Sequence, residues 1–218
     1  MIASSAQVNL LFATSLGVGT VAEPARLNGM LAAAIGARRP GIAGRAEMAQ
    51  AWKFSEDLAI WGGEGAALLA GELRAAADRL TLDVGAREVP RYRWDVTMTA
   101  YVAQRGEVGE TSKRHDAFWR ALYFIDDGYA GDRNATGGEL VIEDPRLPAP
   151  LMEDPDLRLR LQLQQGGAIY MEEAVLRPAA GRLLMLPGWL RVVHRPHNGK
   201  GERIWISADL VAHRLGGS

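Results

Sequence analysis

The sequence of 218 residues contains no cysteine. This absence excludes disulfide frameworks, thiolate metal sites and cysteine nucleophiles. A chain of this size without disulfides fits a reducing compartment, so we expect a cytoplasmic protein. We expect no membrane span either, because no run approaches ~18 apolar residues. The apolar stretch near the start also lacks the basic region of a signal peptide and is broken by Asn9, Thr14 and Ser15.

The sequence also lacks an excess of one charge sign. It has 25 Lys and Arg residues against 26 Asp and Glu residues. This balance gives no electrostatic reason to expect nucleic acid or a membrane surface as a partner. The hydrophobic fraction of 48% suits one domain with a substantial core. Because no repeat or linker divides the chain, we predict a single domain over residues 1–218.

Residues 1–90 are predicted to form a mainly helical N-terminal cover. Apolar residues recur at helical spacing over residues 27–37, and the segment 38–41 (RRPG) ends that run. A second helix is predicted over residues 64–80, with Leu69, Leu73, Ala76 and Leu80 on one face. Residues 17–19 (GVG) have no third glycine and no following Lys-Ser/Thr, so we interpret them as a turn rather than a phosphate loop.

From about residue 91 the pattern changes to short strands, and we predict a β core over residues 91–214. The segments alternate and are rich in β-branched and aromatic residues, with Gly, Pro, Asn and Asp between them. The predicted strands are 93–102, 118–125, 139–143, 168–176, 181–186, 190–194 and 203–211. Many short strands after two helices predict an α+β protein built on a closed or sandwiched antiparallel sheet.

Histidine is scarce, and its positions suggest a metal site. The chain has four histidines, at positions 115, 194, 197 and 213. His115 with the adjacent Asp116, and His194 far downstream, are the residue types of a facial triad, in which two imidazoles and one carboxylate hold Fe(II). Scattered surface histidines are nevertheless more common than metal ligands, and the sequence has no closely spaced histidine pair on a helix.

Several motifs strengthen the metal interpretation through a family resemblance. The segment 136–146 (TGGELVIEDPR) resembles the GGEL-type strand of iron- and 2-oxoglutarate-dependent oxygenases. Similar strand motifs lie at 118–126 (FWRALYFID), 187–190 (PGWL) and 201–207 (GERIWIS). With Leu-Phe-Ala-Thr at 11–14, the chain resembles the small bacterial 2OG-Fe(II) oxygenase family over nearly its full length.

This resemblance implies a double-stranded β-helix of the jelly-roll or cupin-like type, with the N-terminal helices packed on it. It also implies a non-haem, hydroxylase-type oxygenase that uses Fe(II) and 2-oxoglutarate on a small molecule. His115, Asp116 and His194 would bind iron, and Glu110 or Glu139 could supply the carboxylate instead. Arg203 would grip 2-oxoglutarate through two parallel hydrogen bonds, in a cavity shared with Tyr101, Tyr123 and Trp205.

The sequence departs from the family at the functional positions. The H-x-H element of the family falls on Ser112-Lys113-Arg114, and its distal histidine falls on Val192. His194 lies two residues further on, about 6.6 Å along a strand. The small serine expected two residues after Arg203 is Trp205, whose indole could fill the co-substrate cavity.

These departures leave alternatives open. One is a metal-free descendant with no cofactor, acting either as a non-oxidative enzyme or as a binding subunit for an active paralogue. In it, Ser112, Arg114 and Val192 would occupy the ancestral ligand positions, with the Arg114 guanidinium in place of the cation. A further alternative is a halogenase-like variant, because residues 115–117 spell H-x-A. Self-association into a homo-oligomer also stays open.

Overall fold

The computed structural model describes residues 13–38, 50–85, 92–110, 116–132, 134–146, 161, 168 and 170–215. The described helices are α1 (Pro24–Arg38), α2 (Leu58–Trp61) and α3 (Gly63–Leu80). The described strands are β1 (Gly17–Thr20), β2 (Trp52–Lys53), β3 (Tyr92–Ala103), β4 (Trp119–Asp126), β5 (Leu140–Glu143), β6 (Glu173–Leu176), β7 (Arg182–Pro187), β8 (Val192–His194) and β9 (Arg203–Arg214).

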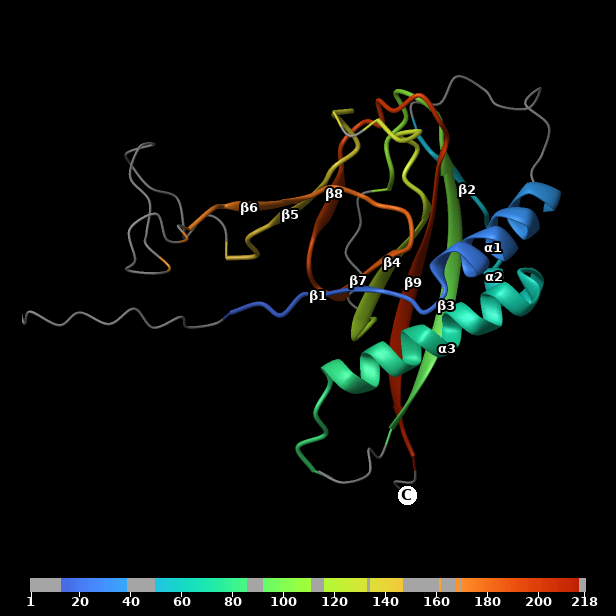
Figure 1. Ribbon diagram of the computed structural model, residues 1–218. Helices are drawn as coiled ribbons and strands as arrows, with labels where there is room; N and C mark the ends of the chain where they lie inside the picture. Colours follow the sequence, from blue (N-terminus) through green and yellow to red (C-terminus); the bar gives the residue numbers. More distant parts are fainter. Residues whose placement is uncertain are drawn as a thin grey trace, which may run out of the picture.

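The described strands form two sheets, and within each sheet neighbouring strands pair antiparallel. The larger sheet has the order β1-β7-β4-β9-β3-β2, and the smaller one has the order β6-β5-β8. Figure 1 shows the helices on one side of the larger sheet and the smaller sheet on the other. This is the predicted α+β architecture, a jelly-roll core with helices packed on it.

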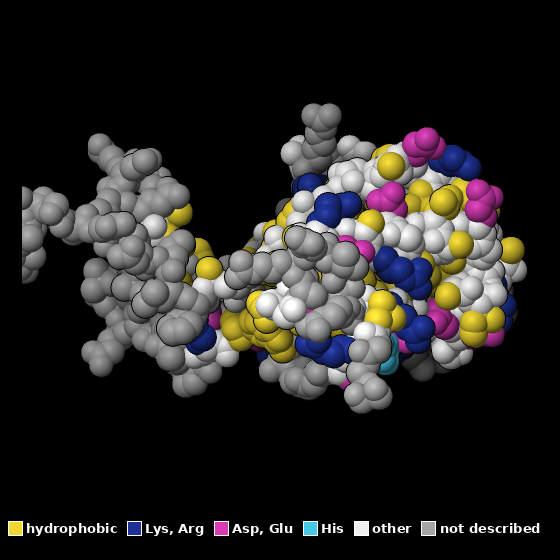
Figure 2. Space-filling view, turned by 90° about the horizontal axis from the view of Figure 1, so that it is seen from below, with side chains coloured by type: hydrophobic (Ala, Val, Ile, Leu, Met, Phe, Trp, Pro, Cys, Tyr) yellow, Lys and Arg dark blue, Asp and Glu magenta, His cyan; other side chains and the backbone are white. Residues whose placement is uncertain are grey.

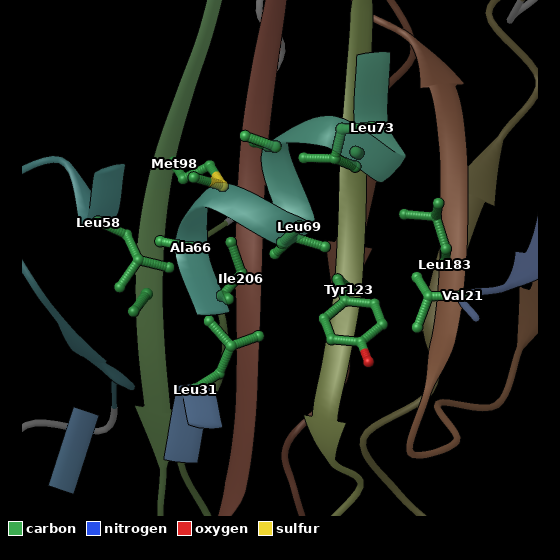
Figure 3. Close-up of a cluster of buried hydrophobic side chains, with 14 of the residues drawn as sticks. Val21, Leu31, Leu58, Ala66, Leu69, Leu73, Met98, Tyr123, Leu183 and Ile206 are labelled. Carbon is green, nitrogen blue, oxygen red and sulfur yellow. The ribbon is translucent and has the colours of Figure 1, made fainter. Parts of the chain in front are cut away.

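An apolar core lies between the larger sheet and the helices α1 and α3. Leu27, Leu31 and Ile35 are buried on α1, and Leu69 and Leu73 are buried on α3, at the spacing that puts side chains on one helix face. They pack in one cluster with residues of four sheet strands, including Met98, Tyr123, Leu183 and Ile206 (Figure 3). Fully burying a side chain of this size contributes about 1.5–3 kcal/mol, so this layer holds the helices on the sheet.

The opposite face of the larger sheet, together with the smaller sheet, encloses the interior of the barrel. The side chains that alternate with the helix-facing ones point into this space. The interior cluster consists of Tyr101, Ala103, Leu122, Phe124, Leu184, Leu186 and Trp205 from the larger sheet, and Leu140, Ile142 and Val192 from the smaller one, with Leu190 beside them. Tyr101 and Trp205, two of the residues predicted to line the site, belong to this second cluster.

The structure corrects several predicted elements. Residues 17–19 are a strand rather than a turn, because they pair with β7, and a Cβ on Gly17 would lie 2.7 Å from Leu80. The short β2 was not predicted. The strand expected over 168–176 covers only 173–176, since its partner β5 ends before the Asp144-Pro145 turn. The strand expected over 190–194 begins at Val192. Among the described helices, none has the length and apolar character needed to cross a membrane.

Candidate functional site

A stack of three aromatic rings occupies the barrel interior. Trp205 is only 2% exposed and lies between two rings. On one side is Tyr101, its neighbour on β3, with ring centroids 5.0 Å apart and planes 7° from parallel. On the other side is His194 of β8, with centroids 5.5 Å apart and an interplanar angle of 30°. The stack therefore joins the two sheets across the interior, and the Trp205 indole points inward as expected.

The His194 ring is enclosed. A Cβ on Gly109 would lie 2.6 Å from its Cγ and Nδ1, so only glycine allows the backbone to approach this closely. The ring's Nε2 is buried and has no hydrogen-bond partner among the described residues. Burial, together with the positive charges of Arg120 and Arg203, lowers the pKa of His194 to about 3. The imidazole is therefore neutral at physiological pH.

Arg203 points inward but is bonded to the backbone. Its Nε donates to the Asp127 carbonyl oxygen at 3.1 Å, and its Nη1 donates to the Gly138 carbonyl oxygen at 2.6 Å. Its Cζ lies 5.3 Å from the centre of the Tyr129 ring. Nη2 is buried without a partner in the described part of the chain, and burial lowers the pKa of the guanidinium. Two donors that could grip a ligand carboxylate are thus already used.

Glycine residues make room for Arg203 and for a second buried histidine, His197. A Cβ on Gly138 would lie 2.3 Å from the Arg203 guanidinium, and one on Gly128 would lie 2.5 Å from the His197 ring. The Nε2 of His197 is 2.8 Å from the Gly201 carbonyl oxygen, while its Nδ1 is buried and has no described partner. Burial lowers the pKa of His197 as well.

Gly109 belongs to a segment that lies beside residues 50–53. Its neighbour Val108 accepts a hydrogen bond from the Ala51 backbone at 2.8 Å. The Glu110 carboxylate accepts a hydrogen bond from the Tyr101 hydroxyl at 2.9 Å and pairs with the Lys53 ammonium at 2.7 Å. Lys53 therefore supplies a fixed positive charge beside this carboxylate.

Arg120 was not among the predicted site residues. It is 2% exposed on β4, and its Nε lies 3.4 Å from the Ser207 hydroxyl on β9. A basic residue within the otherwise apolar strand WRALYFI was the sequence signal for an inward-facing charge. The interior thus holds two arginines and a neutral histidine within an apolar cluster.

The placement predicted for Tyr123 is wrong. Tyr123 pairs with Ile206, whereas Tyr101 pairs with Trp205, and neighbouring strand residues face opposite sides of a sheet. Tyr123 therefore faces the helices (Figure 3). Its hydroxyl donates to the side-chain oxygen of Asn28 on α1 at 2.5 Å. Burial raises the pKa of this phenol to about 12.

The structure does not bring Asp116 to His194. Asp116 is exposed, two residues before Phe118, whose backbone nitrogen donates to the Leu210 carbonyl oxygen. Leu210 is five residues along β9 from Trp205, about 16 Å at ~3.3 Å per residue. Val192 is buried in the interior cluster. The predicted ligand His115 and the positions Ser112 and Arg114 lie outside the described residues, so their roles stay predictions.

Comparison with known proteins identifies the fold. No family model matches the sequence. No curated protein matches it either. Among solved structures, a prolyl-4-hydroxylase from Pseudomonas putida is similar, with 16% identity, a TM-score of 0.54 and coverage of 91% of this chain and 93% of that chain. HygX from Streptomyces hygroscopicus, solved with nickel and 2-oxoglutarate bound, has 13% identity, a TM-score of 0.53 and coverage of 91% and 83%.

A third similar structure is a prolyl hydroxylase from Trichoplax adhaerens, solved with a hypoxia inducible factor peptide. It has 10% identity, a TM-score of 0.54 and coverage of 90% of this chain and 83% of that chain. The chain therefore has the fold of the 2OG-Fe(II) oxygenases. At these identities the similarity establishes the fold and leaves the chemistry to the residues of the site.

The described residues do not fit an iron site. The buried Nε2 of His194 is a suitable metal ligand, but no group of three His, Cys, Asp or Glu side chains in the described ranges could hold a metal ion. A facial triad needs three such ligands. The co-substrate position is also altered, because Trp205 fills the interior and Arg203 is bonded to carbonyl oxygens.

Proposed function

We propose that this protein is a metal-independent binding protein that retains the oxygenase fold without iron-dependent oxidation. The observation that carries the proposal is the stack of Tyr101, Trp205 and His194 in the barrel interior. With Gly109 against the His194 ring, these side chains fill the interior in which the family resemblance placed the co-substrate. Protein interiors packed in this way leave few voids larger than water, so ligands bind elsewhere.

The state of Arg203 supports the same proposal. An arginine that binds a carboxylate offers two parallel N–H donors in a planar fork. Here Nε and Nη1 are bonded to backbone carbonyl oxygens, which leaves Nη2 for a ligand. Arg203 therefore stabilises the loops that carry Asp127 and Gly138. We further propose that the ligand is a small molecule and that neither nucleic acid nor a membrane is a partner.

Metal binding tests this proposal directly. We expect the purified protein, titrated anaerobically with Co(II) as a spectroscopic substitute for Fe(II), to show no stoichiometric ligand-field absorption. We also expect Co(II) to leave the affinity for 2-oxoglutarate unchanged in calorimetry. The variants His194→Ala and His213→Ala are matched controls, because the first removes an interior histidine and the second an exposed one. Stoichiometric Co(II) binding that is lost in His194→Ala and kept in His213→Ala would overturn the proposal.

The second candidate is a 2-oxoglutarate-dependent oxygenase that acts on a small molecule. The observation that favours it is the unpartnered Nε2 of His194, since a buried imidazole nitrogen without a hydrogen bond is costly unless something binds it. His115 would then be the second histidine. Co(II) binding that depends on both His194 and His115, with tighter 2-oxoglutarate binding in its presence, is the result that this candidate requires.

A further inference from the structure

Two hollows lie next to Tyr129, which lines both of them. The first has a volume of about 460 Å³ and is lined by Asp127, Tyr129, Gly131, Asp132, Arg177, Pro178, Ala179 and Arg182. The second has a volume of about 440 Å³ and is lined by Arg105, Tyr129, Asp132, Asn134, Ala135, Thr136, Asn198, Gly199 and Lys200. Both are large enough for a small-molecule ligand. Their electrostatics differ.

The arginines of the first hollow are already engaged. The Arg177 guanidinium lies 4.2 Å from the centre of the Tyr129 ring, and its Nη2 donates to the Asp132 carbonyl oxygen at 3.0 Å. Arg182 donates through Nη1 to the Arg177 carbonyl oxygen at 2.8 Å. Asp127 and Asp132 add two negative charges to this lining. The positive charges of the first hollow are therefore balanced by carbonyl and carboxylate groups of its own lining.

The second hollow carries donors and positive charge that no described group satisfies. Arg105 and Lys200 form no ion pair with any residue in the described ranges. Among the described residues of the lining, Asp132 alone is acidic, and its Oδ1 accepts the Asn134 backbone N–H at 2.9 Å. Asn198 and Thr136 add an amide and a hydroxyl. Two cations and two neutral donors that line the same hollow can bind an anion.

The loops that carry these groups are fixed to one another. The Gly106 backbone donates to the His197 carbonyl oxygen at 2.6 Å, and the His197 backbone donates to the Glu107 carbonyl oxygen at 2.9 Å. These two bonds hold the loop of Arg105 beside the segment of Asn198 and Lys200. The Tyr129 hydroxyl donates to the Gly137 carbonyl oxygen at 2.9 Å and fixes the aromatic wall. A site assembled before the ligand arrives loses less entropy on binding.

We propose that this second hollow, the rim site, binds a small molecule that carries a carboxylate or phosphate group. Arg105 and Lys200 hold the anionic group, Asn198 and Thr136 donate hydrogen bonds to it, and the Tyr129 ring contacts the rest of the ligand. This inference rests on the proposed binding role, for which it names the ligand class. It uses none of the residues at the stack of Tyr101, Trp205 and His194.

Titration with inorganic phosphate and with succinate tests the rim site and separates the two anion classes. We expect at least one of them to cause saturable changes at the backbone amides of residues 105–107, 134–137 and 198–201 in two-dimensional NMR spectra. In the double variant Arg105→Ala/Lys200→Ala we expect binding at least tenfold weaker. Both side chains are exposed, so this variant keeps the fold. The control Arg26→Ala/Arg93→Ala removes the same charge from α1 and β3 and should bind like the wild type.

Changes that do not saturate, or equal affinity in the two double variants, would overturn the rim site. The outcome is independent of the metal test. If the binding of 2-oxoglutarate is lost in Arg105→Ala/Lys200→Ala and does not depend on Co(II), the ligand binds at the rim site. Binding that requires Co(II) and His194 belongs to the interior and overturns the proposed function, while the rim site stands or falls on its own titration.

Discussion

Both faces of the larger sheet are buried, but they differ in chemistry. The helix-covered face is apolar apart from contacts such as that between Tyr123 and Asn28. The interior face encloses Arg120, Arg203 and His194 within a cluster of hydrophobic side chains. Buried charges cost stability unless they are hydrogen-bonded, so a fold selected for stability alone has little reason to keep them. The interior retains the residue types of a binding site, and its packing gives them structural roles.

Among the changes that test this difference between the faces, removal of the Trp205 indole should have the largest effect on stability. Truncating a fully buried tryptophan costs about 3–5 kcal/mol, so we expect Trp205→Ala to lower the free energy of unfolding by about 4 kcal/mol in urea denaturation. Trp189→Ala is the control, because Trp189 is 47% exposed and its loss should cost less than about 0.5 kcal/mol. Equal effects of the two variants would mean that the interior is not a packed core.

A smaller effect is expected from a methyl group beside Arg203. Gly138 and Gly131 both have φ of +78°, but only Gly138 abuts the guanidinium, whereas nothing lies within 4 Å of a Cβ at Gly131. Gly131→Ala should therefore report the backbone strain alone, about 1–2 kcal/mol. Gly138→Ala should cost about 2 kcal/mol more. In an Arg203→Ala background this excess should disappear, and an unchanged excess in the double-mutant cycle would contradict the contact.

The pH dependence of stability should distinguish the interior face, which holds His194, from the helix-covered face, and it does so without truncating a side chain. The folded pKa of His194 is about 3, below the ordinary value of ~6.5, so the unfolded chain binds more protons between these values. This contribution is fully present above pH ~6.5 and is lost as pH falls toward 3, by at most about 1.4 kcal/mol per unit. The neighbouring His197 adds in the same direction.

The window from pH 6.5 to 4.5 separates the contribution of the buried histidines from that of Asp144. The pKa of Asp144 is lowered by its hydrogen bonds with Arg146, so its stabilisation is lost only below the ordinary carboxylate range. We expect His194→Leu to flatten the slope of the unfolding free energy in this window. His213→Ala, which removes an exposed histidine, should keep it. Equal slopes in the wild type and His194→Leu would place the titrating group elsewhere.

The smallest effect is expected on the helix-covered face. Tyr123→Phe removes the hydrogen bond to Asn28 and should lower the unfolding free energy by about 1 kcal/mol. The affinity of the rim site for phosphate or succinate should not change, because Tyr123 faces away from the interior. A loss of anion binding in this variant would show that the two faces are coupled.

The fold followed from the sequence more completely than the site did. Period-two patterning from about residue 91 and the helical spacing around Leu31 and Leu69 predicted the main strands and helices, because such patterns record which side of an element is buried. The edge strands β1 and β2 were missed, since short edge strands are selected by their partners rather than by their own composition.

The site depended on contacts between distant residues. The inward orientation of Trp205 followed from its position two residues after Arg203. The position of Tyr123 was wrong because the facing of β4 relative to β9 is set by their register. Nothing in the local sequence connects Gly109 with His194, or Gly138 with Arg203, because these are contacts between loops and strands far apart in the chain.

The position of β9 has a consequence for synthesis on the ribosome. β9 lies between β3 and β4 and pairs with β3 over its whole length, from Arg203 opposite Ala103 to Arg214 opposite Tyr92. When β3 emerges, about a hundred residues must still be translated before its partner exists, which is some 5–20 s at ~5–20 residues per second. During that interval the facing edges of β3 and β4 have no strand between them. The nascent chain therefore needs protection from aggregation until its last strand is inserted.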